Sequence, residues 1–134
     1  MNYLLDTHIV LWSLFEPARL APAIRSILEG EDDTKYVSGV NFWEISLKYS
    51  LGKLELGGMT PAELFNVVNE AGFEVLDLGG RFLATSYQLP KKVDHRDPFD
   101  RLLIWQAISE GFTLLTQDTK IEQYQVDGLK VVIG

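Results

Sequence analysis

The sequence predicts an α/β fold of three layers, in which helices cover both faces of a central parallel sheet. Three observations predict it. Strand-like runs alternate with helical patterns along the whole chain. The strands are short and uninterruptedly apolar, as in Thr113–Leu115, which is typical of a sheet buried on both faces. No internal repeat, low-complexity run or linker divides the chain, so we expect residues 1–134 to form one domain.

The first half of the chain contains three helical patterns and two strand-like ones. Pro22 sits where a first helical turn tolerates it, and Gly30 stands in the position of a C-terminal cap. The expected elements, in order, are a strand at Tyr3–Leu5, helices at His8–Phe15 and Pro22–Leu28, a strand at Lys35–Ser38 and a helix at Phe42–Tyr49.

The second half begins with the clearest helix start in the sequence. Thr60 supplies a capping hydroxyl, Pro61 suits the first helical position, and Glu63 bonds back to the cap. A later helix starts at Asp97-Pro98 and is apolar on nearly every turn, so we expect it to be buried on more than one side. The expected elements are a helix to Ala71, a strand at Phe73–Leu78, helices at Arg81–Gln88 and Phe99–Glu110, and strands at Phe112–Thr116 and Val131–Ile133.

The composition excludes several classes of site. The chain has no cysteine, which excludes disulfides, thiolate nucleophiles and cysteine-ligated zinc. The absence of cysteine is compatible with a reducing cytoplasm. The amino-terminal residues lack the features of a signal peptide, and polar residues interrupt every apolar run, so we expect a soluble protein. The 12 basic and 19 acidic residues give a formal charge of −7. That balance argues against a broad basic surface for nucleic acid, unless bound cations reverse the local field.

Four acidic residues stand where a parallel sheet opens into a crevice. Asp6 and Asp118 each follow a strand. Glu44 falls near the start of the helix after the second strand, and Asp100 falls in the first turn of the helix before Thr113–Thr116. Carboxylates packed together repel one another, and a divalent cation removes that cost. Because oxygen ligands select hard cations, the sequence predicts a site for Mg²⁺ or Mn²⁺.

Three of these acids also have a purely structural interpretation. Asp6 and Asp118 are suitable helix caps, a role that stabilises a helix by about 1 kcal/mol. Glu44 has Lys48 four residues later, a spacing typical of an ion pair worth about 0.3 to 0.5 kcal/mol. Taken alone, Asp6 and Asp118 are explained as well by capping as by chemistry, whereas Glu44 is better explained by the ion pair.

Asp97 and Asp100 differ in this respect. Asp97 precedes a proline at the start of its helix and is best explained as the cap. Asp100 shares its side of the helix with Ile104 and Ala107, so its carboxylate is expected to point along a buried face. Because a buried unpaired charge is costly, a metal partner explains Asp100 better than solvent does.

The other candidate groups favour structural roles. His8 sits in an apolar first turn and is better explained as a packed or capping residue than as a base. His95 lies in a basic turn, where it either contacts phosphate or is solvated. Trp12, Trp43 and Trp105 fall in apolar helical stripes and are expected in the core. The sequence contains no nucleophile elbow and no glycine-rich phosphate loop.

Four motifs, in order along the whole chain, resemble the signature of PIN domains, and in particular of VapC-type toxins from bacterial toxin–antitoxin pairs. They are Leu4-Leu5-Asp6-Thr7-His8, Trp43-Glu44-Ile45-Ser46-Leu47-Lys48, His95-Arg96-Asp97-Pro98-Phe99-Asp100-Arg101 and Thr116-Gln117-Asp118. The resemblance implies a sheet of strand order 3-2-1-4-5 and an endoribonuclease held silent by a cognate antitoxin. It also implies a homodimer and an antitoxin segment laid over the active-site groove.

Carried over motif by motif, the resemblance implies that the catalytic and metal-binding acids are Asp6, Glu44, Asp100 and Asp118. The residues expected to orient them are Thr116, Thr7 and Asp97. An ion held by these acids would orient a water molecule and neutralise charge on the scissile phosphate. The basic residues expected to contact the RNA backbone are Lys48, Arg96 and Arg101.

Two other functions are compatible with the sequence. A receiver-type phosphoacceptor domain is also an α/β fold with acids at its strand ends. It normally needs adjacent acids after the first strand, whereas here Asp6 is followed by Thr7. A binding module without catalytic activity would use the same acids only as helix caps.

Overall fold

The computed structural model describes residues 1–134 and contains a sheet of five parallel strands. The strand order is β3-β2-β1-β4-β5, which confirms the order implied by the resemblance. The strands are β1 (Asn2–Leu5), β2 (Thr34–Ser38), β3 (Glu74–Leu76), β4 (Thr113–Thr116) and β5 (Lys130–Ile133).

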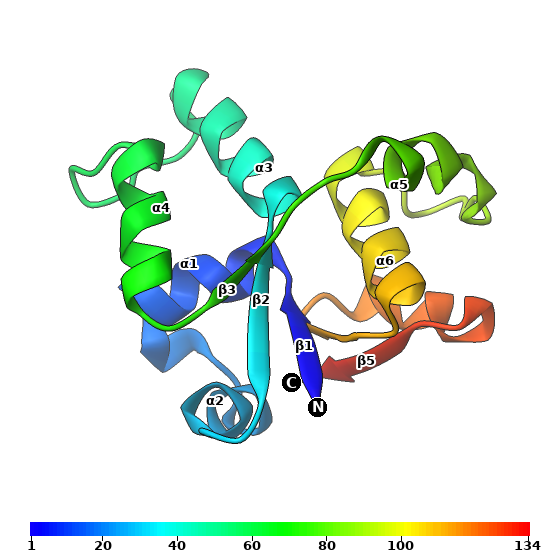
Figure 1. The fold of residues 1–134 in the computed structure, drawn as a ribbon, viewed down its shortest axis with the longest axis horizontal. Helices are drawn as coiled ribbons and strands as arrows, with labels where there is room; N and C mark the ends of the chain where they lie inside the picture. Colours follow the sequence, from blue (N-terminus) through cyan, green and yellow to red (C-terminus); the bar gives the residue numbers. More distant parts are fainter.

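Helices cover both faces of this sheet, which confirms the three-layer α/β/α architecture. In Figure 1, α1, α2 and α4 lie on one side of the strands and α6 lies on the other. The helices are α1 (Thr7–Phe15), α2 (Pro22–Glu29), α3 (Gly39–Ser50), α4 (Pro61–Glu70), α5 (Gly80–Thr85) and α6 (Pro98–Glu110). The 3₁₀ segments are η1 (Pro17–Arg19), η2 (Ser86–Gln88) and η3 (Thr119–Asp127). None of these helices combines the length and the apolar character that crossing a bilayer requires.

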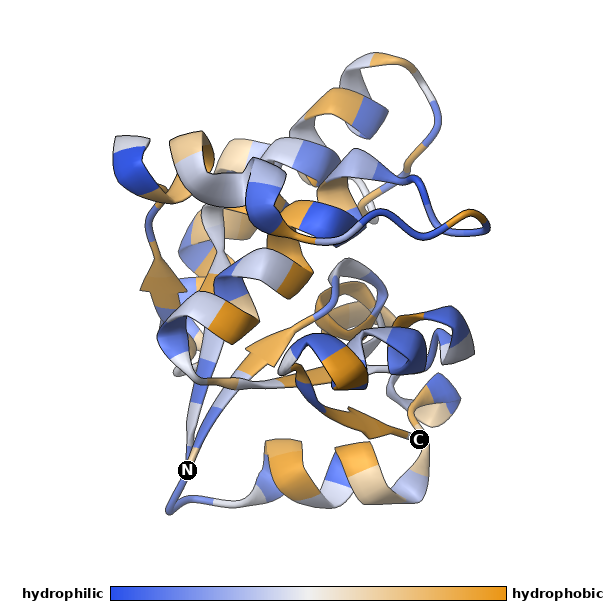
Figure 2. Cartoon of the chain, turned by 90° about the vertical axis from the view of Figure 1, so that its right-hand side faces the viewer, coloured by the Kyte–Doolittle hydropathy of each residue, from blue (hydrophilic) through white to orange (hydrophobic).

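Two hydrophobic clusters, one on each face of the sheet, hold the layers together. Successive side chains of a strand point to opposite faces. Leu5 therefore packs with α1, α2 and α4, whereas Leu4 packs with α6 and η3, and Leu115 and Leu114 of β4 divide in the same way. Figure 2 shows hydrophobic residues on the strand arrowheads and on stripes of the helices. The central strands β1 and β4 are thus fixed from both sides, which holds their carboxyl ends in place.

The helix boundaries follow the sequence signals closely. Thr60 and Glu63 form the expected capping box, since each side chain accepts the backbone N–H of the other residue. Asp97 caps α6 by accepting two backbone N–H groups of its first turn. Gly111 ends α6 in the left-handed conformation with φ of 72°, which a residue with a Cβ adopts only at a cost.

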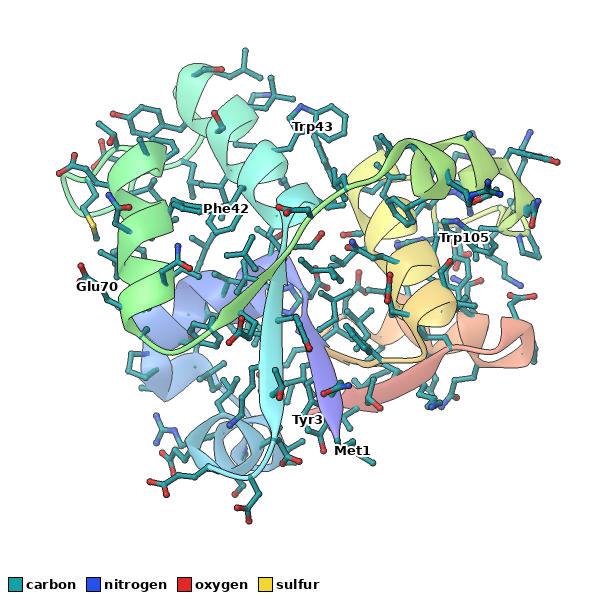
Figure 3. The ribbon with its side chains drawn as sticks, viewed as in Figure 1. Met1, Tyr3, Phe42, Trp43, Glu70 and Trp105 are labelled. Carbon is teal, nitrogen blue, oxygen red and sulfur yellow. The ribbon has the colours of Figure 1, made fainter.

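The structure differs from the sequence analysis in three places. The expected strand at Phe73–Leu78 is only three residues long, and the residues after Asp118 form a 3₁₀ segment that was not expected. The expectation that Trp43 lies in the core is wrong, because Trp43 is 51% exposed. Figure 3 shows it on the side of α3 that faces α6, where its ring meets Phe99 at a centroid distance of 4.8 Å. Helix α3 packs on the sheet through other residues, so an apolar position on it is not necessarily buried.

Candidate active site

A cleft of about 380 Å³ lies at the carboxyl end of the sheet. Its acidic lining residues are Asp6 after β1, Glu44 on α3, and Asp97 and Asp100 at the start of α6. Figure 1 shows that α1, α3 and α6 begin at this same end of the sheet. Open parallel sheets bind ligands at this edge because loops and helix N-termini converge there. The fold therefore brings three of the four predicted metal-binding acids into one cleft.

Asp6 is almost fully buried, and both of its oxygens accept hydrogen bonds. Oδ1 accepts the backbone N–H of Thr7 at 2.8 Å, which caps α1, and Oδ2 accepts the hydroxyl of Thr116 at 2.7 Å. Nδ1 of His8 lies 3.5 Å from Oδ2. Burial raises the pKa of Asp6 above its ordinary value, and the charge of Glu44 adds to this effect. His8 and the two hydrogen bonds act in the opposite direction but do not cancel it.

Glu44 is buried in the cleft wall and held by two neighbours. Its Oε1 accepts the hydroxyl of Thr7 at 2.6 Å, and its Oε2 pairs with Nζ of Lys48 at 2.5 Å. Asn41 fixes Thr7 in turn, because its Nδ2 donates to Oγ1 of Thr7 at 3.0 Å. The hydrogen bond to Glu44 is the main cause of a raised pKa at Lys48. The expected ion pair between Glu44 and Lys48 is confirmed, and both residues line the cleft, with Glu44 buried and Lys48 partly exposed.

The carboxyl group of Asp100 is also perturbed by burial and by its charged neighbours. Its side chain is 22% exposed, in agreement with the expected buried orientation. Burial is the first cause that raises the pKa of Asp100 to about 8, followed by the charges of Asp6, Asp97, Glu44 and Asp118. Burial and neighbouring carboxylates both disfavour the negative charge of Asp100. A cation bound there would offset that cost, so this position favours cation binding.

Asp118 lies beside the cleft and is coupled to it through Thr116. Its Oδ1 accepts the backbone N–H of Lys120 at 3.0 Å and so caps η3. The backbone N–H of Asp118 donates to the hydroxyl of Thr116 at 3.1 Å. Because that hydroxyl also donates to Asp6, Thr116 links the two acids that follow β1 and β4.

The donor set fits a hard divalent cation. One oxygen each of Asp100 and Asp118 and one ring nitrogen of His95 lie within 4.8 Å of one another. Asp6 and Glu44 are close enough for their charges to raise the pKa of Asp100. Asp100 therefore lies close both to Asp118 and His95 and to the two other acids of the cleft. Carboxylate oxygens are the ligands that Mg²⁺ and Mn²⁺ prefer.

The three residues expected to contact RNA differ in how many of their donors are free. Lys48 is engaged in its ion pair. Arg101 donates to two backbone carbonyls of the preceding loop, at 2.8 and 3.0 Å, so it fixes that loop to α6. Arg96 is exposed and, with Lys91, lines a basic pocket of about 500 Å³. Arg96 is therefore the most accessible cation of the three.

Sequence reasoning missed the roles of three buried polar residues. The option that His95 is solvated is wrong, because this residue is 5% exposed and its Nε2 lies 3.3 Å from Oδ2 of Asp100. The position of His95 five residues before Asp100 was the available signal. Tyr124 and Asn41 gave none, since their partners in the site are 29 and 34 residues away.

Comparison with known proteins gives a family match over most of the chain. The family model of the PIN domain matches residues 3–127. The chain belongs to the PIN domain family. The matched range contains the four predicted acids, so the match includes the whole candidate site of this PIN domain.

Individual relatives extend the similarity of this PIN domain. Over 122 residues it is 25% identical to Ribonuclease VapC22 of Mycobacterium tuberculosis, with 91% of each chain covered. Its fold is similar to that of VapBC2 from Rickettsia felis, a structure solved with a DNA fragment from the VapBC2 promoter. The TM-score is 0.73 at 18% identity, and the match covers 100% of this chain and 99% of that chain. A toxin–antitoxin complex from Klebsiella pneumoniae also matches, with a TM-score of 0.60, 18% identity and coverage of 97% and 95%. At these identities the solved structures show a shared fold.

Proposed function

We propose that this PIN domain is a metal-dependent endoribonuclease that hydrolyses RNA phosphodiester bonds and acts as the toxin of a toxin–antitoxin pair. The observation that carries the proposal is the convergence of Asp6, Glu44 and Asp100 in one cleft, with Asp118 joined to it through Thr116. The similarity to a relative named as a ribonuclease supports RNA as the substrate. In this proposal the whole chain acts as a single domain.

The proposed catalytic and metal-binding residues are Asp6, Glu44, Asp100 and Asp118, and the proposed ion is Mg²⁺ or Mn²⁺. When bound, such an ion supplies a water of lowered pKa and positive charge for the scissile phosphate. The carboxylates bind the ion and exclude soft metals, because they offer only hard oxygen ligands.

Three neighbouring residues hold these acids in position. The Thr7 hydroxyl donates to Glu44, and the Thr116 hydroxyl donates to Asp6. Asp97 fixes the first turn of α6 and with it the place of Asp100, because it accepts the backbone N–H of Asp100 at 3.0 Å. Such positioning avoids reorganisation when the substrate binds.

The RNA backbone is proposed to lie between the acidic cleft and the basic pocket. Arg96 and Lys91 are exposed at that pocket and supply contacts to phosphate that do not depend on base sequence. Lys48 lies at the cleft itself, where it offsets part of the acidic charge. Arg101 contributes its charge to the pocket while its N–H groups hold the loop.

The proposed protein partners are a cognate antitoxin and a second copy of this chain, and the proposed compartment is the cytoplasm. The shared fold with a solved toxin–antitoxin complex supports the antitoxin. Trp43, Leu47 and Leu51 follow one another at intervals of four residues on and just after α3 and are 51%, 39% and 59% exposed. This apolar stripe supports the homodimer, because exposed apolar patches commonly mark protein interfaces.

Cleavage of RNA by the purified protein with Mg²⁺ or Mn²⁺ tests the nuclease. Asp6→Asn and Asp100→Asn keep the side-chain shape and remove the charge, and we expect each to lower the rate at least about 100-fold, because several kcal/mol of charge stabilisation are lost. Asp32→Asn is the matched control, since Asp32 is exposed just before β2 at the opposite end of the sheet. Equal cleavage by all four proteins would contradict the proposed site.

The two alternative functions have tests of their own. A receiver-type domain incubated with acetyl phosphate forms a stable aspartyl phosphate, and we expect none here. A binding module whose acids only cap helices gains no stability from metal. We expect millimolar Mn²⁺ to raise the midpoint of thermal unfolding, because a ligand that binds only the folded state stabilises it.

A further inference from the structure

We infer that His95 is a positioning residue: Arg101 and Tyr124 hold it as a hydrogen-bond donor to the carboxylate of Asp100, and it is not a ligand of the ion. The inference rests on the proposed function, because Asp100 is one of the acids that would hold the ion. Both roles for His95 are geometrically open at first sight, since its ring lies among the candidate ligand atoms. The hydrogen bonds behind the ring decide between them.

Four side chains form a continuous line of contacts. Nη1 of Arg101 lies 3.1 Å from the hydroxyl of Tyr124, and that hydroxyl lies 2.8 Å from Nδ1 of His95. Nε2 of His95 lies 3.3 Å from Oδ2 of Asp100. Tyr124 is fully buried and His95 is 5% exposed, so their polar groups must find partners within the protein.

Arg101 stands at one end of these contacts and determines which atom donates and which accepts in each hydrogen bond. The guanidinium of Arg101 only donates, so the oxygen of Tyr124 accepts from it. The hydroxyl proton of Tyr124 then has Nδ1 of His95 as its acceptor, and Nδ1 carries no proton. In a neutral imidazole the proton is consequently on Nε2, the nitrogen that faces Asp100.

This tautomer excludes His95 as a ligand and gives it another role. An ion needs the lone pair of a ring nitrogen, whereas Nε2 presents an N–H toward Oδ2 of Asp100. That N–H would orient the carboxylate of Asp100, one of the acids that would hold the ion. Hydrogen-bond partners that orient metal ligands typically contribute 10-fold to 100-fold in affinity.

His8 provides an internal comparison with the opposite tautomer. Its Nε2 accepts the backbone N–H of Gln117 at 2.9 Å, so its proton is on Nδ1, which faces Asp6 at 3.5 Å. The chain contains two histidines. Each therefore presents a protonated nitrogen to a different acid of the cleft, and the two rings are protonated on different nitrogens.

Nuclear magnetic resonance of the ¹⁵N-labelled protein saturated with Mg²⁺ tests the inference directly. Long-range ¹H–¹⁵N correlations distinguish protonated from unprotonated ring nitrogens, and a His8→Gln variant assigns the two rings. We expect a protonated Nε2 and an unprotonated Nδ1 for His95, and the reverse for His8.

Tyr124→Phe tests the part of the line behind the ring. This variant keeps the buried aromatic ring and removes only the hydroxyl. We expect His95 to populate both tautomers and calorimetry to show Mg²⁺ affinity lowered about 10-fold. Tyr3→Phe is the control, because Tyr3 is also buried but packs in the cluster on the other face of the sheet.

Each outcome decides for or against the inference. An unprotonated Nε2 in the Mg²⁺-loaded protein would make His95 a ligand and overturn it. Tautomers and Mg²⁺ affinity unchanged in Tyr124→Phe would overturn it as well. If the unaltered protein binds no Mg²⁺, the inference fails together with the proposed metal site. If the tautomers and affinities are as expected but RNA is not cleaved, the inference stands and only the nuclease assignment fails.

Discussion

Replacing Asp100 by asparagine should make the metal-free protein more stable at neutral pH. The carboxyl of Asp100 is partly buried and surrounded by other carboxylates, and these two causes raise its pKa to about 8. At pH 7 the folded protein must therefore either keep a proton on Asp100 or accept an unfavourable charge there. The asparagine amide in Asp100→Asn has nearly the same shape as the carboxyl and needs no such proton, so the variant is free of this cost.

The sign and size of the effect follow from proton linkage. In the unfolded chain the pKa of Asp100 returns to its ordinary value of 3.8, so between about pH 4 and pH 8 the folded state binds more protons than the unfolded state. The free energy of unfolding therefore falls as pH rises through this window. One such group changes it by at most about 1.4 kcal/mol per pH unit, or up to about 3 kcal/mol between pH 5 and pH 7. The raised pKa of Asp6 acts in the same direction.

Urea unfolding at pH 5, 6 and 7 in the presence of a chelator measures this dependence, with tryptophan fluorescence as the signal. We expect the free energy of unfolding to decrease with pH in the unaltered protein and in the exposed control Asp32→Asn, and to decrease less in Asp100→Asn. Saturating Mg²⁺ should flatten the dependence in the unaltered protein, because the cation offsets the carboxylate charges. Identical slopes in Asp100→Asn and the control, or stability that increases with pH, would refute the reasoning.

Two further changes test the support and the substrate contacts of the site. Thr116→Val removes a buried hydroxyl that donates to Asp6 and accepts from the backbone N–H of Asp118. Urea unfolding should therefore show a free energy of unfolding lowered by about 1 to 3 kcal/mol. Thr119→Val, at an exposed position, should not lower it in this way. Arg96→Gln, made in an Asp6→Asn background that prevents cleavage, should reduce the slope of log affinity for single-stranded RNA against log salt by about 0.7. An unchanged slope, as expected for Arg25→Gln on α2, would show that Arg96 contacts no phosphate.

The fold was largely predictable because its signals are local. The capping box at Thr60 and Glu63 and the apolar run at Thr113–Thr116 are complete within a few residues, and both were found where expected. The 3₁₀ segment Thr119–Asp127 was missed because such segments have no hydrophobic period of their own to detect. Trp43 was misplaced because periodicity identifies an apolar stripe on α3 but not which neighbour, if any, covers it.

The site was predictable only in part, for a related reason. Asp6 and Asp118 could be located because strand ends of a parallel sheet share one edge. The groups that fix these acids come from distant positions: Thr116 reaches Asp6 across 110 residues, and Thr7 reaches Glu44 across 37. Such partners depend on the final distances between elements, which composition and spacing do not contain.

The capping and metal-binding interpretations of the acids proved to be compatible, because a carboxylate has two oxygens. Asp118 uses Oδ1 to cap η3, and the structure gives its Oδ2 no hydrogen bond, so that oxygen is available to an ion. Asp6 caps α1 through Oδ1, and this oxygen retains a second lone pair, whereas Oδ2 faces both the Thr116 hydroxyl and Nδ1 of His8. Capping fixes the carboxylate to a rigid helix start, and a fixed carboxylate loses less entropy when it binds a cation. Helix capping by these carboxylates therefore favours the proposed metal binding. A substitution that removes a cap should lower both the stability of the fold and the affinity for metal.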